Sequence, residues 1–92
     1  MHLEIVSPEA TLFSGEVESV ALPGSLGDFQ VLNHHAPIVS TLTEGTVKIK
    51  GNLSLDEAVK AQFVKEDATT TLFKIRSGTV EMLDNKMILL AD

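Results

Sequence analysis

Residues Thr46-Val47-Lys48-Ile49-Lys50 alternate strictly between polar and apolar side chains. Successive side chains of an extended strand point to opposite faces, so Val47 and Ile49 share one face and the polar residues share the other. One buried face and one solvated face are typical of a strand in an antiparallel sheet. This stretch therefore predicts a half-buried strand.

The same alternation recurs along the chain between glycine, proline and asparagine breakers. It is found in His2-Leu3-Glu4-Ile5, in Asp28-Phe29-Gln30-Val31 and in Thr71-Leu72-Phe73-Lys74-Ile75-Arg76, where only Leu72 departs from it. Two further short segments are Thr79 to Leu83 and Lys86 to Leu90. The last two segments flank Asp84-Asn85, a turn-prone pair at the spacing of a tight β-hairpin. Met87-Ile88-Leu89-Leu90 is apolar on both faces, which indicates an interior or interface strand. The pattern predicts an all-β domain.

One segment, around residues 54–65, interrupts this rhythm. Ser54 and Glu57 have the spacing of a helix capping box, and an apolar stripe follows at helical intervals. Its members are Leu55, Ala58, Val59, Gln62 and Phe63. We expect a short inserted helix here. The competing interpretation makes Ala61 to Lys65 a strand paired with Thr71 to Arg76.

Composition limits the classes of protein that the chain can belong to. Its 92 residues suit one domain, spanning 1–92, and 13 Asp+Glu against 7 Lys+Arg give a net charge of −6. The first cation is Lys48, so no basic cluster favours nucleic acid. There is no cysteine for a disulfide or thiolate site, and no apolar run of about 18 residues for a membrane span. With Glu4 near the start, the N-terminus does not resemble a secretory signal, which favours a cytoplasmic domain.

The most distinctive loop candidate is Pro23-Gly24-Ser25-Leu26-Gly27-Asp28. Glycines permit a protruding turn that presents backbone N–H groups and one carboxylate. The loop is no phosphate-binding loop, because no Lys follows Gly27, and no nucleophile elbow, because Pro23 stands where glycine is needed. It is either a simple surface turn or a partner-binding loop.

The sequence offers weak grounds for catalysis or metal binding. His34 and His35 are adjacent, so in an extended backbone they point apart, and no further histidine or cysteine at chelating spacing is nearby. Ser25 as nucleophile, Asp28 as orienting residue and His35 as base could form a catalytic trio only if the fold brings them together. We therefore expect no catalytic residue, no metal site and no cofactor.

An ordered set of segments resembles the N-terminal domain of the ε subunit of bacterial F-type ATP synthase. The segments are Phe13-Ser14-Gly15-Glu16-Val17-Glu18-Ser19-Val20, Pro23-Gly24-Ser25-Leu26-Gly27-Asp28-Phe29, His35-Ala36-Pro37-Ile38-Val39 with Leu42 and Gly45, and Ser77-Gly78-Thr79-Val80-Glu81 with Asn85 and Leu89-Leu90-Ala91-Asp92. Together they cover most of the chain in the family's order.

The resemblance implies a two-sheet β-sandwich and a noncatalytic subunit of the rotating central stalk. Carried over by position, Gly24, Ser25, Leu26, Gly27 and Asp28 would contact the c-ring, and His35 and Ser40 would contact the γ subunit. The implied location is peripheral, at the cytoplasmic face of the bacterial inner membrane. The alternative is a freestanding β-sandwich that binds a small ligand or peptide.

The sequence departs from the family pattern at three places. The family commonly continues into a C-terminal helical hairpin that can inhibit hydrolysis or bind ATP, whereas this sequence ends at Asp92, so a complete chain would do neither. The region from Asn52 to Asp67 is longer than a tight connection requires; it either packs its apolar stripe on the sandwich or adds a contact with γ. Asn33-His34 occupies a position where the family often has Pro-Gly.

Overall fold

Strands make up most of the computed structural model, which describes Met1–Asp92. The elements are β1 (His2–Val6), β2 (Thr11–Glu16), β3 (Ser19–Gly24), β4 (Gly27–Leu32), β5 (Ile38–Leu42), β6 (Gly45–Lys50), the 3₁₀ helix η1 (Lys60–Gln62), β7 (Phe63–Asp67), β8 (Thr70–Ile75), β9 (Gly78–Leu83) and β10 (Lys86–Ala91). The expected strands are therefore present, including the one at residues 46–50.

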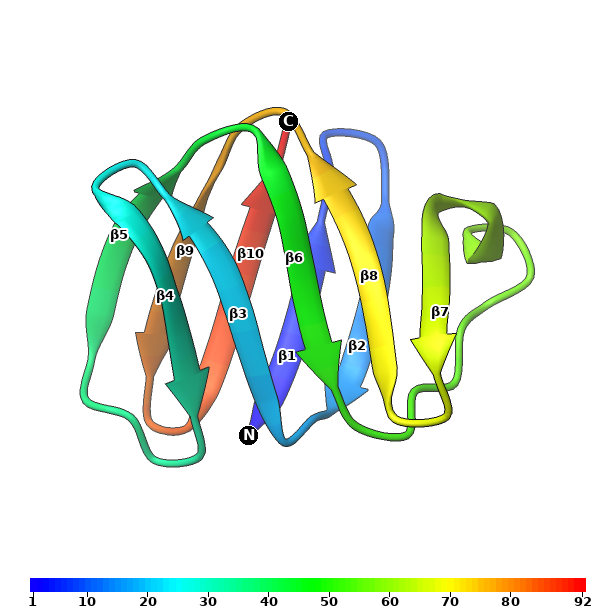
Figure 1. Cartoon of the computed structure of the whole chain (residues 1–92), viewed down its shortest axis with the longest axis horizontal. Helices are drawn as coiled ribbons and strands as arrows, with labels where there is room; N and C mark the ends of the chain where they lie inside the picture. Colours follow the sequence, from blue (N-terminus) through cyan, green and yellow to red (C-terminus); the bar gives the residue numbers. More distant parts are fainter.

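The strands form two layers that face each other (Figure 1). One layer has the order β2-β1-β10-β9-β5 and the other β4-β3-β6-β8-β7. Neighbouring strands are antiparallel, except that β1 runs parallel to β10. The layers join at one corner, where Gly24 of β3 pairs with Leu42 of β5. This is the two-sheet β-sandwich that the sequence predicts.

The core lies between the two layers and contains 21 buried hydrophobic residues. Val47 and Ile49 are fully buried, as their alternation with lysine and threonine predicts. Phe73 and Ile75 of β8 are also buried, and the Phe73 ring stacks on Phe63 with 4.9 Å between centroids. Burial of these side chains removes apolar area from water, which is the main stabilising contribution to such a fold.

β10 is an interior strand, as its apolar character on both faces predicts. It lies between β1 and β9, with Met87 and Leu89 fully buried in the core. On its outer face Ile88 is half-buried and Leu90 is 49% exposed. The hydrophobic side chains on its inner face thus hold the middle of the first sheet.

The short helix expected around residues 54–65 is present only in small part. Only Lys60–Gln62 is helical, as a single 3₁₀ turn, and Ser54 makes no capping hydrogen bond. Instead the Asp56 carboxylate accepts a hydrogen bond of 2.9 Å from the Ala58 N–H, which closes a local turn. The competing strand, expected over Ala61 to Lys65, is confirmed from Phe63 onward, because β7 (Phe63–Asp67) pairs with β8.

Packing explains why the strand forms in place of the helix. A helix would carry Phe63 on the same stripe as Ala58 and Gln62, which are exposed, whereas the strand places Phe63 against Phe73 in the core. Upstream, Leu53 is buried and Leu55 packs against the core. The region 52–67 therefore packs Leu53, Leu55, Val59 and Phe63 on the sandwich, which is one of the two roles left open for it.

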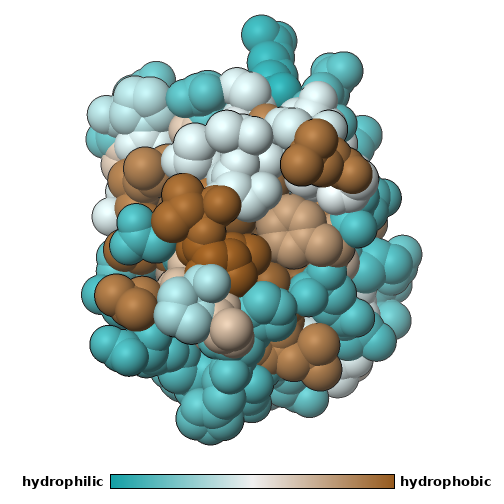
Figure 2. Space-filling view, turned by 90° about the vertical axis from the view of Figure 1, so that its left-hand side faces the viewer, coloured by the Kyte–Doolittle hydropathy of each residue, from teal (hydrophilic) through white to brown (hydrophobic).

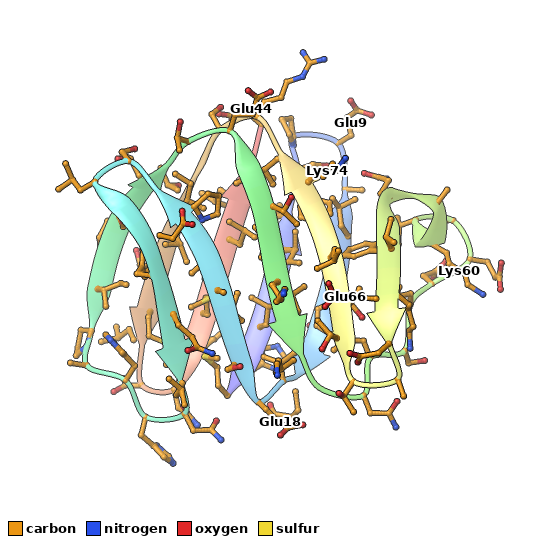
Figure 3. The ribbon with its side chains drawn as sticks, in the orientation of Figure 1. Glu9, Glu18, Glu44, Lys60, Glu66 and Lys74 are labelled. Carbon is orange, nitrogen blue, oxygen red and sulfur yellow. The ribbon has the colours of Figure 1, made fainter.

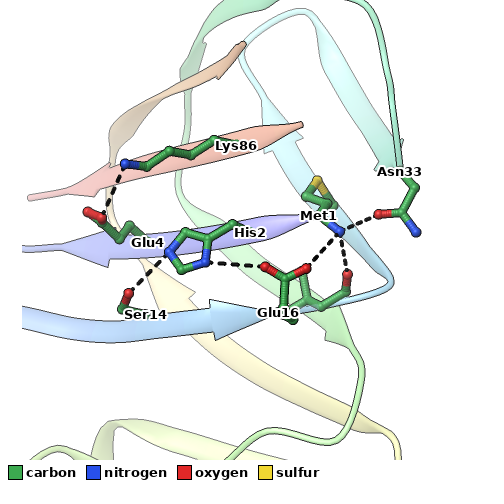
Figure 4. A network of polar contacts seen from close by, with 8 residues as sticks. Met1, His2, Glu4, Ser14, Glu16, Asn33 and Lys86 are labelled. Carbon is green, nitrogen blue, oxygen red and sulfur yellow. Dashed lines mark hydrogen bonds and ion pairs between the residues drawn. The ribbon is translucent and has the colours of Figure 1, made fainter. Parts of the chain in front are cut away.

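Charged groups make several polar contacts near the start of β1 (Figure 4). The Met1 amino group donates to Asn33 Oδ1 and, at 3.2 Å, to the Val17 carbonyl. Lys86 pairs with Glu4 at 3.8 Å. The contact to Asn33 fixes the β4–β5 connection against the bottom of the sandwich.

Asp84 and Asn85 form the predicted hairpin turn between β9 and β10. Both have positive φ, 50° and 59°, which matches the tight turn type that joins twisted antiparallel strands. His34 also has positive φ, 62°, at the position where the family often has glycine. Its N–H donates to Asn85 Oδ1 at 2.7 Å, so the hairpin turn supports the β4–β5 connection.

Replacing Asn85 by alanine is expected to lower the free energy of unfolding by about 1–2 kcal/mol. Alanine tolerates positive φ poorly and has no acceptor for the His34 N–H. Urea denaturation of the two proteins measures the change. Glu57→Ala, on an exposed turn, is the control and should alter stability by less than about 0.5 kcal/mol. An Asn85→Ala protein as stable as the control would refute the role of this turn.

Candidate functional site

The β3–β4 hairpin projects from the top of the sandwich in Figure 1, and it contains all five residues expected to contact a ring. Leu26 at its tip is fully exposed, and Asp28 is exposed at the start of β4. Gly27 has φ of +126°, a conformation that favours glycine. At Gly24 a Cβ atom would lie 2.6 Å from the Gly27 carbonyl oxygen, so the turn needs glycine at both positions.

Hydrogen bonds tie the base of this hairpin to β5 and the turn after it. The Ser25 N–H donates to the Thr41 carbonyl at 3.1 Å, and the Thr43 N–H donates to the Pro23 carbonyl at 2.9 Å. The Thr41 hydroxyl also donates to the Ser25 hydroxyl at 3.0 Å. Ser25 therefore braces the hairpin, which presents Leu26 and Asp28 on a rigid base.

The end of the sandwich that carries the hairpin is rich in acidic side chains. Figure 3 shows Glu9 in the β1–β2 turn and Glu44 in the β5–β6 turn at this end, pointing into solvent. Neither carboxylate, nor that of Asp28, has a cation within ion-pair distance. Lys74 and Arg76 are also exposed at this end of the domain, so an approaching partner meets both signs of charge, with the unpaired Asp28 carboxylate beside the apolar tip.

The trio of Ser25, Asp28 and His35 is not brought together. The first two lie at the top of the sandwich and His35 lies in the β4–β5 connection at the bottom (Figure 1). β4, whose six residues span about 20 Å, runs between the two ends. The His35 ring Nδ1 lies 2.7 Å from the Ala36 carbonyl oxygen. The Ser25 hydroxyl and the His35 ring are therefore too far apart to act as a nucleophile and its base.

The side chains of His34 and His35 form no metal centre. No group of three or more His, Asp or Glu side chains is placed so that it could hold a metal ion. His34 is exposed, and its contact with Asn85 is made through the backbone. The adjacent histidines thus form part of the connection between β4 and β5.

The two residues expected to contact γ lie at the edge formed by β5. His35 is exposed just before the strand, and Ser40 is half-buried within it, donating through its hydroxyl to the Thr41 carbonyl at 3.2 Å. Successive side chains of a strand point to opposite faces, so Ser40 points toward the inside of the sandwich while Val39 points outward, and the Ser40 side chain is only partly accessible. His35 and Ser40 therefore flank an exposed surface whose centre is another residue.

That centre is Val39, which is 79% exposed. Together with its neighbours it forms a shallow notch of about 220 Å³, which we call the β5 patch. The patch is lined by Pro37, Ile38, Val39, Glu81, Met82 and Leu83. Figure 2 views this side of the molecule and shows apolar side chains gathered on it. Exposed apolar surface of this kind marks sites of protein association.

Sequence reasoning missed Val39 and Leu83, although a signal was available. Ile38-Val39 and Met82-Leu83 are consecutive apolar pairs within strands, and only one member of each pair can face the core. The structure places Ile38 opposite Met82 and Val39 opposite Glu81 on β9. Pairing β5 with β9 brings the two outward apolar residues to one surface, and this pairing of distant segments is not evident from local periodicity.

No helix in the structure has the length and apolar character needed to cross a membrane. The fold and the two exposed surfaces instead define a β-sandwich domain with a protruding acidic hairpin at one end and an apolar patch at one side. These are features of a module that docks onto other proteins.

The chain belongs to the family of the ATP synthase delta/epsilon chain, β-sandwich domain, whose model matches residues 1–92. It is 39% identical over 92 residues to the ATP synthase epsilon chain of Caulobacter vibrioides, covering 100% of this chain and 90% of that protein. The epsilon chain of Chlorobaculum tepidum is 40% identical over 90 residues, with 98% and 86% covered. That of Campylobacter fetus is 39% identical over 92 residues, but the chain covers 60% of its length. The chain is accordingly an ATP synthase subunit.

Two solved structures share the fold. A chain of the Tetrahymena thermophila mitochondrial ATP synthase central stalk and c-ring superposes with a TM-score of 0.72 at 15% identity, covering 99% of this chain and 62% of that one. A chain of the Euglena gracilis mitochondrial ATP synthase gives 0.73 at 15% identity, with 97% and 48% covered. At this identity the likeness concerns the fold, which is the same sandwich.

Proposed function

We propose that the chain is a noncatalytic rotor subunit of the ATP synthase central stalk. In this proposal the β5 patch, flanked by His35 and Ser40, binds the γ subunit, and the hairpin tip from Gly24 to Asp28 contacts the c-ring. The observation that carries the proposal is that one small domain presents two separate exposed surfaces of different chemistry. Family membership supports this role over a freestanding ligand-binding module.

The proposed mechanism is mechanical coupling. Ion flow turns the ring, the domain transmits the torque to γ, and rotation of γ drives ATP synthesis at catalytic sites on other subunits. A coupling element of this kind must resist deformation, and close-packed interiors are only slightly compressible. The subunit would lie at the cytoplasmic face of the bacterial inner membrane, peripheral to it and held through the complex.

Charge at the hairpin end supports the assignment of the ring contact. The unpaired Asp28 carboxylate beside the tip suits a ring loop with basic side chains, and Glu9 and Glu44 lie at the same end of the domain, together with exposed Lys74 and Arg76. Complementary charge steers association and fixes orientation more than it raises affinity. Leu26 would supply the apolar contact at the centre of this surface.

Replacing Asp28 by lysine is expected to weaken binding of the γ-bound subunit to detergent-solubilised c-ring by about tenfold. The reversed charge repels a basic ring loop, and because Asp28 is exposed the melting temperature should be unchanged. Surface plasmon resonance against immobilised ring measures the affinity. Glu18→Lys, an equal charge change at an exposed position at the opposite end of the domain, is the matched control. Equal ring affinity of the two variants would remove the hairpin from the ring contact.

The proposed function as a whole is tested by mixing the chain with the full γ subunit from the same organism and recording native mass spectra. A one-to-one complex at micromolar concentration is the expected result. If the two proteins remain separate while γ is folded and soluble, the assignment to the central stalk is wrong.

A further inference from the structure

We infer that γ binds by pairing the backbone of one extended segment with the open edge of β5, so that the first sheet continues into γ. This inference rests on the proposed function, because it specifies how γ is held at the β5 patch. The partner segment has to be extended, with an apolar side chain for the notch and a basic side chain to meet Glu81.

The direction of the backbone groups on β5 follows from two sets of contacts. Leu83 pairs with Lys86 across the two-residue hairpin turn, so the N–H and carbonyl of Leu83 point to β10. These directions alternate along an antiparallel strand. The backbone groups of Glu81 therefore also point to β10, and those of Met82 point to β5. The partner of Met82 on β5 is Ile38, whose groups must therefore point back to β9. Groups of the next residue, Val39, point to the opposite side.

Contacts at the top of β5 confirm this alternation. The Thr41 carbonyl and the Thr43 N–H both bond the β3–β4 hairpin, on the side away from β9. The pairing of β5 with β3 is confined to Leu42 and Gly24, so no strand lies opposite Val39. The N–H and carbonyl of Val39 thus face outward at an open sheet edge, next to an apolar notch.

β5 is also the edge strand that lacks protection. Proteins usually shield sheet edges with charged residues, which oppose pairing with another chain. Among the other edge strands, β2 carries Glu16, β4 carries Asp28 and β7 carries Lys65, Glu66 and Asp67. The sequence of β5, Ile-Val-Ser-Thr-Leu, has no charge at all.

The ends of the edge limit where a partner can pair. Pro37 has no N–H, so it leaves no unpaired donor below Val39. Above Thr41 the edge is occupied by the β3–β4 hairpin. A partner strand therefore pairs across Pro37 to Thr41, and its side chains reach the notch on the outer face of the sheet. Strand addition of this kind takes affinity from backbone bonds and specificity from side-chain pockets.

The test replaces Val39 by its α-hydroxy acid, which keeps the side chain but removes the N–H donor. Binding of the full γ subunit is measured by isothermal titration calorimetry, with thermal unfolding of the free variant as a check on folding. Loss of one intermolecular hydrogen bond should raise Kd about fivefold. Hydrogen exchange by NMR on the wild-type complex should show the Val39 amide slowed by about 100-fold or more, as in a paired strand. The Ser40 amide, which points to β9, is the internal control and should be protected in both states.

The outcomes separate this inference from the proposed function. Weaker binding of the ester variant together with protection of the Val39 amide supports strand addition. If γ binds and the ester variant binds as tightly as wild type, or the Val39 amide exchanges unchanged, strand addition is wrong while the γ contact stands. If γ does not bind the wild-type chain, both are wrong.

Discussion

Replacing Val39 by glutamate is expected to weaken binding of γ by about 100-fold or more. Val39 lies at the centre of the β5 patch, 79% exposed in the isolated domain and buried in the proposed complex. A carboxylate at this position would be desolvated in place of the apolar contact, and its neighbour across the sheet, Glu81, has the same charge and already pairs with the basic side chain proposed for the partner. Burial of an unpaired charge costs several kcal/mol, and about 2.7 kcal/mol corresponds to a factor of 100.

The chain offers a matched control in Val64. This residue is also an exposed valine on an edge strand, 60% exposed on β7 of the second sheet, at the other side of the sandwich. Val64→Glu introduces the same charge and should leave the affinity for γ within about twofold of wild type. Calorimetric titration of both variants gives the comparison. Similar affinities for the two would show that γ binds elsewhere on the domain.

Replacing Leu89 by alanine is expected to lower the free energy of unfolding by about 3–4 kcal/mol. Leu89 is fully buried on β10, a central strand of the first sheet, so truncation leaves a cavity that neighbouring strands cannot fill without losing their pairing. In a domain of this size that change lowers the melting temperature by roughly 12–32 °C. Scanning calorimetry measures it directly.

Leu90, the next residue, serves as the comparison for Leu89. Its side chain points to the outer face of the same strand and is 49% exposed, so Leu90→Ala removes the same atoms with little cavity. We expect less than about 1 kcal/mol for this variant. Comparable losses from the two substitutions would mean that the core does not lie on the Leu89 face of the sheet.

Strands with one polar and one apolar face could be predicted from the sequence, because burial follows directly from alternation. Val47 and Ile49 illustrate this, and the Asp84-Asn85 turn was recognisable from its residue types. Both rest on local chemistry: the pleat of a strand and the tolerance of Asn and Asp for positive φ. The sandwich architecture also followed, through resemblance to the family.

Features that depend on long-range pairing could not be predicted in this way. The segment before Phe63 has helical spacing, but contact with Phe73, ten residues further along the chain, decides in favour of a strand. Likewise, Val39 becomes the centre of a surface only when β5 pairs with β9, about forty residues away in sequence. The residues taken by analogy, His35 and Ser40, lie beside this surface.

The most direct test of the proposed role is photo-crosslinking in the assembled ATP synthase. A benzoylphenylalanine residue is placed at Val39 in one strain and at Leu26 in another, and both complexes are irradiated after purification. The two positions lie on different surfaces, at the side and at the end of the domain. We expect Val39 to crosslink to γ and Leu26 to subunit c. Crosslinking of Val39 to any other subunit, or of Leu26 to γ in place of the ring, would contradict the assignment of the two surfaces.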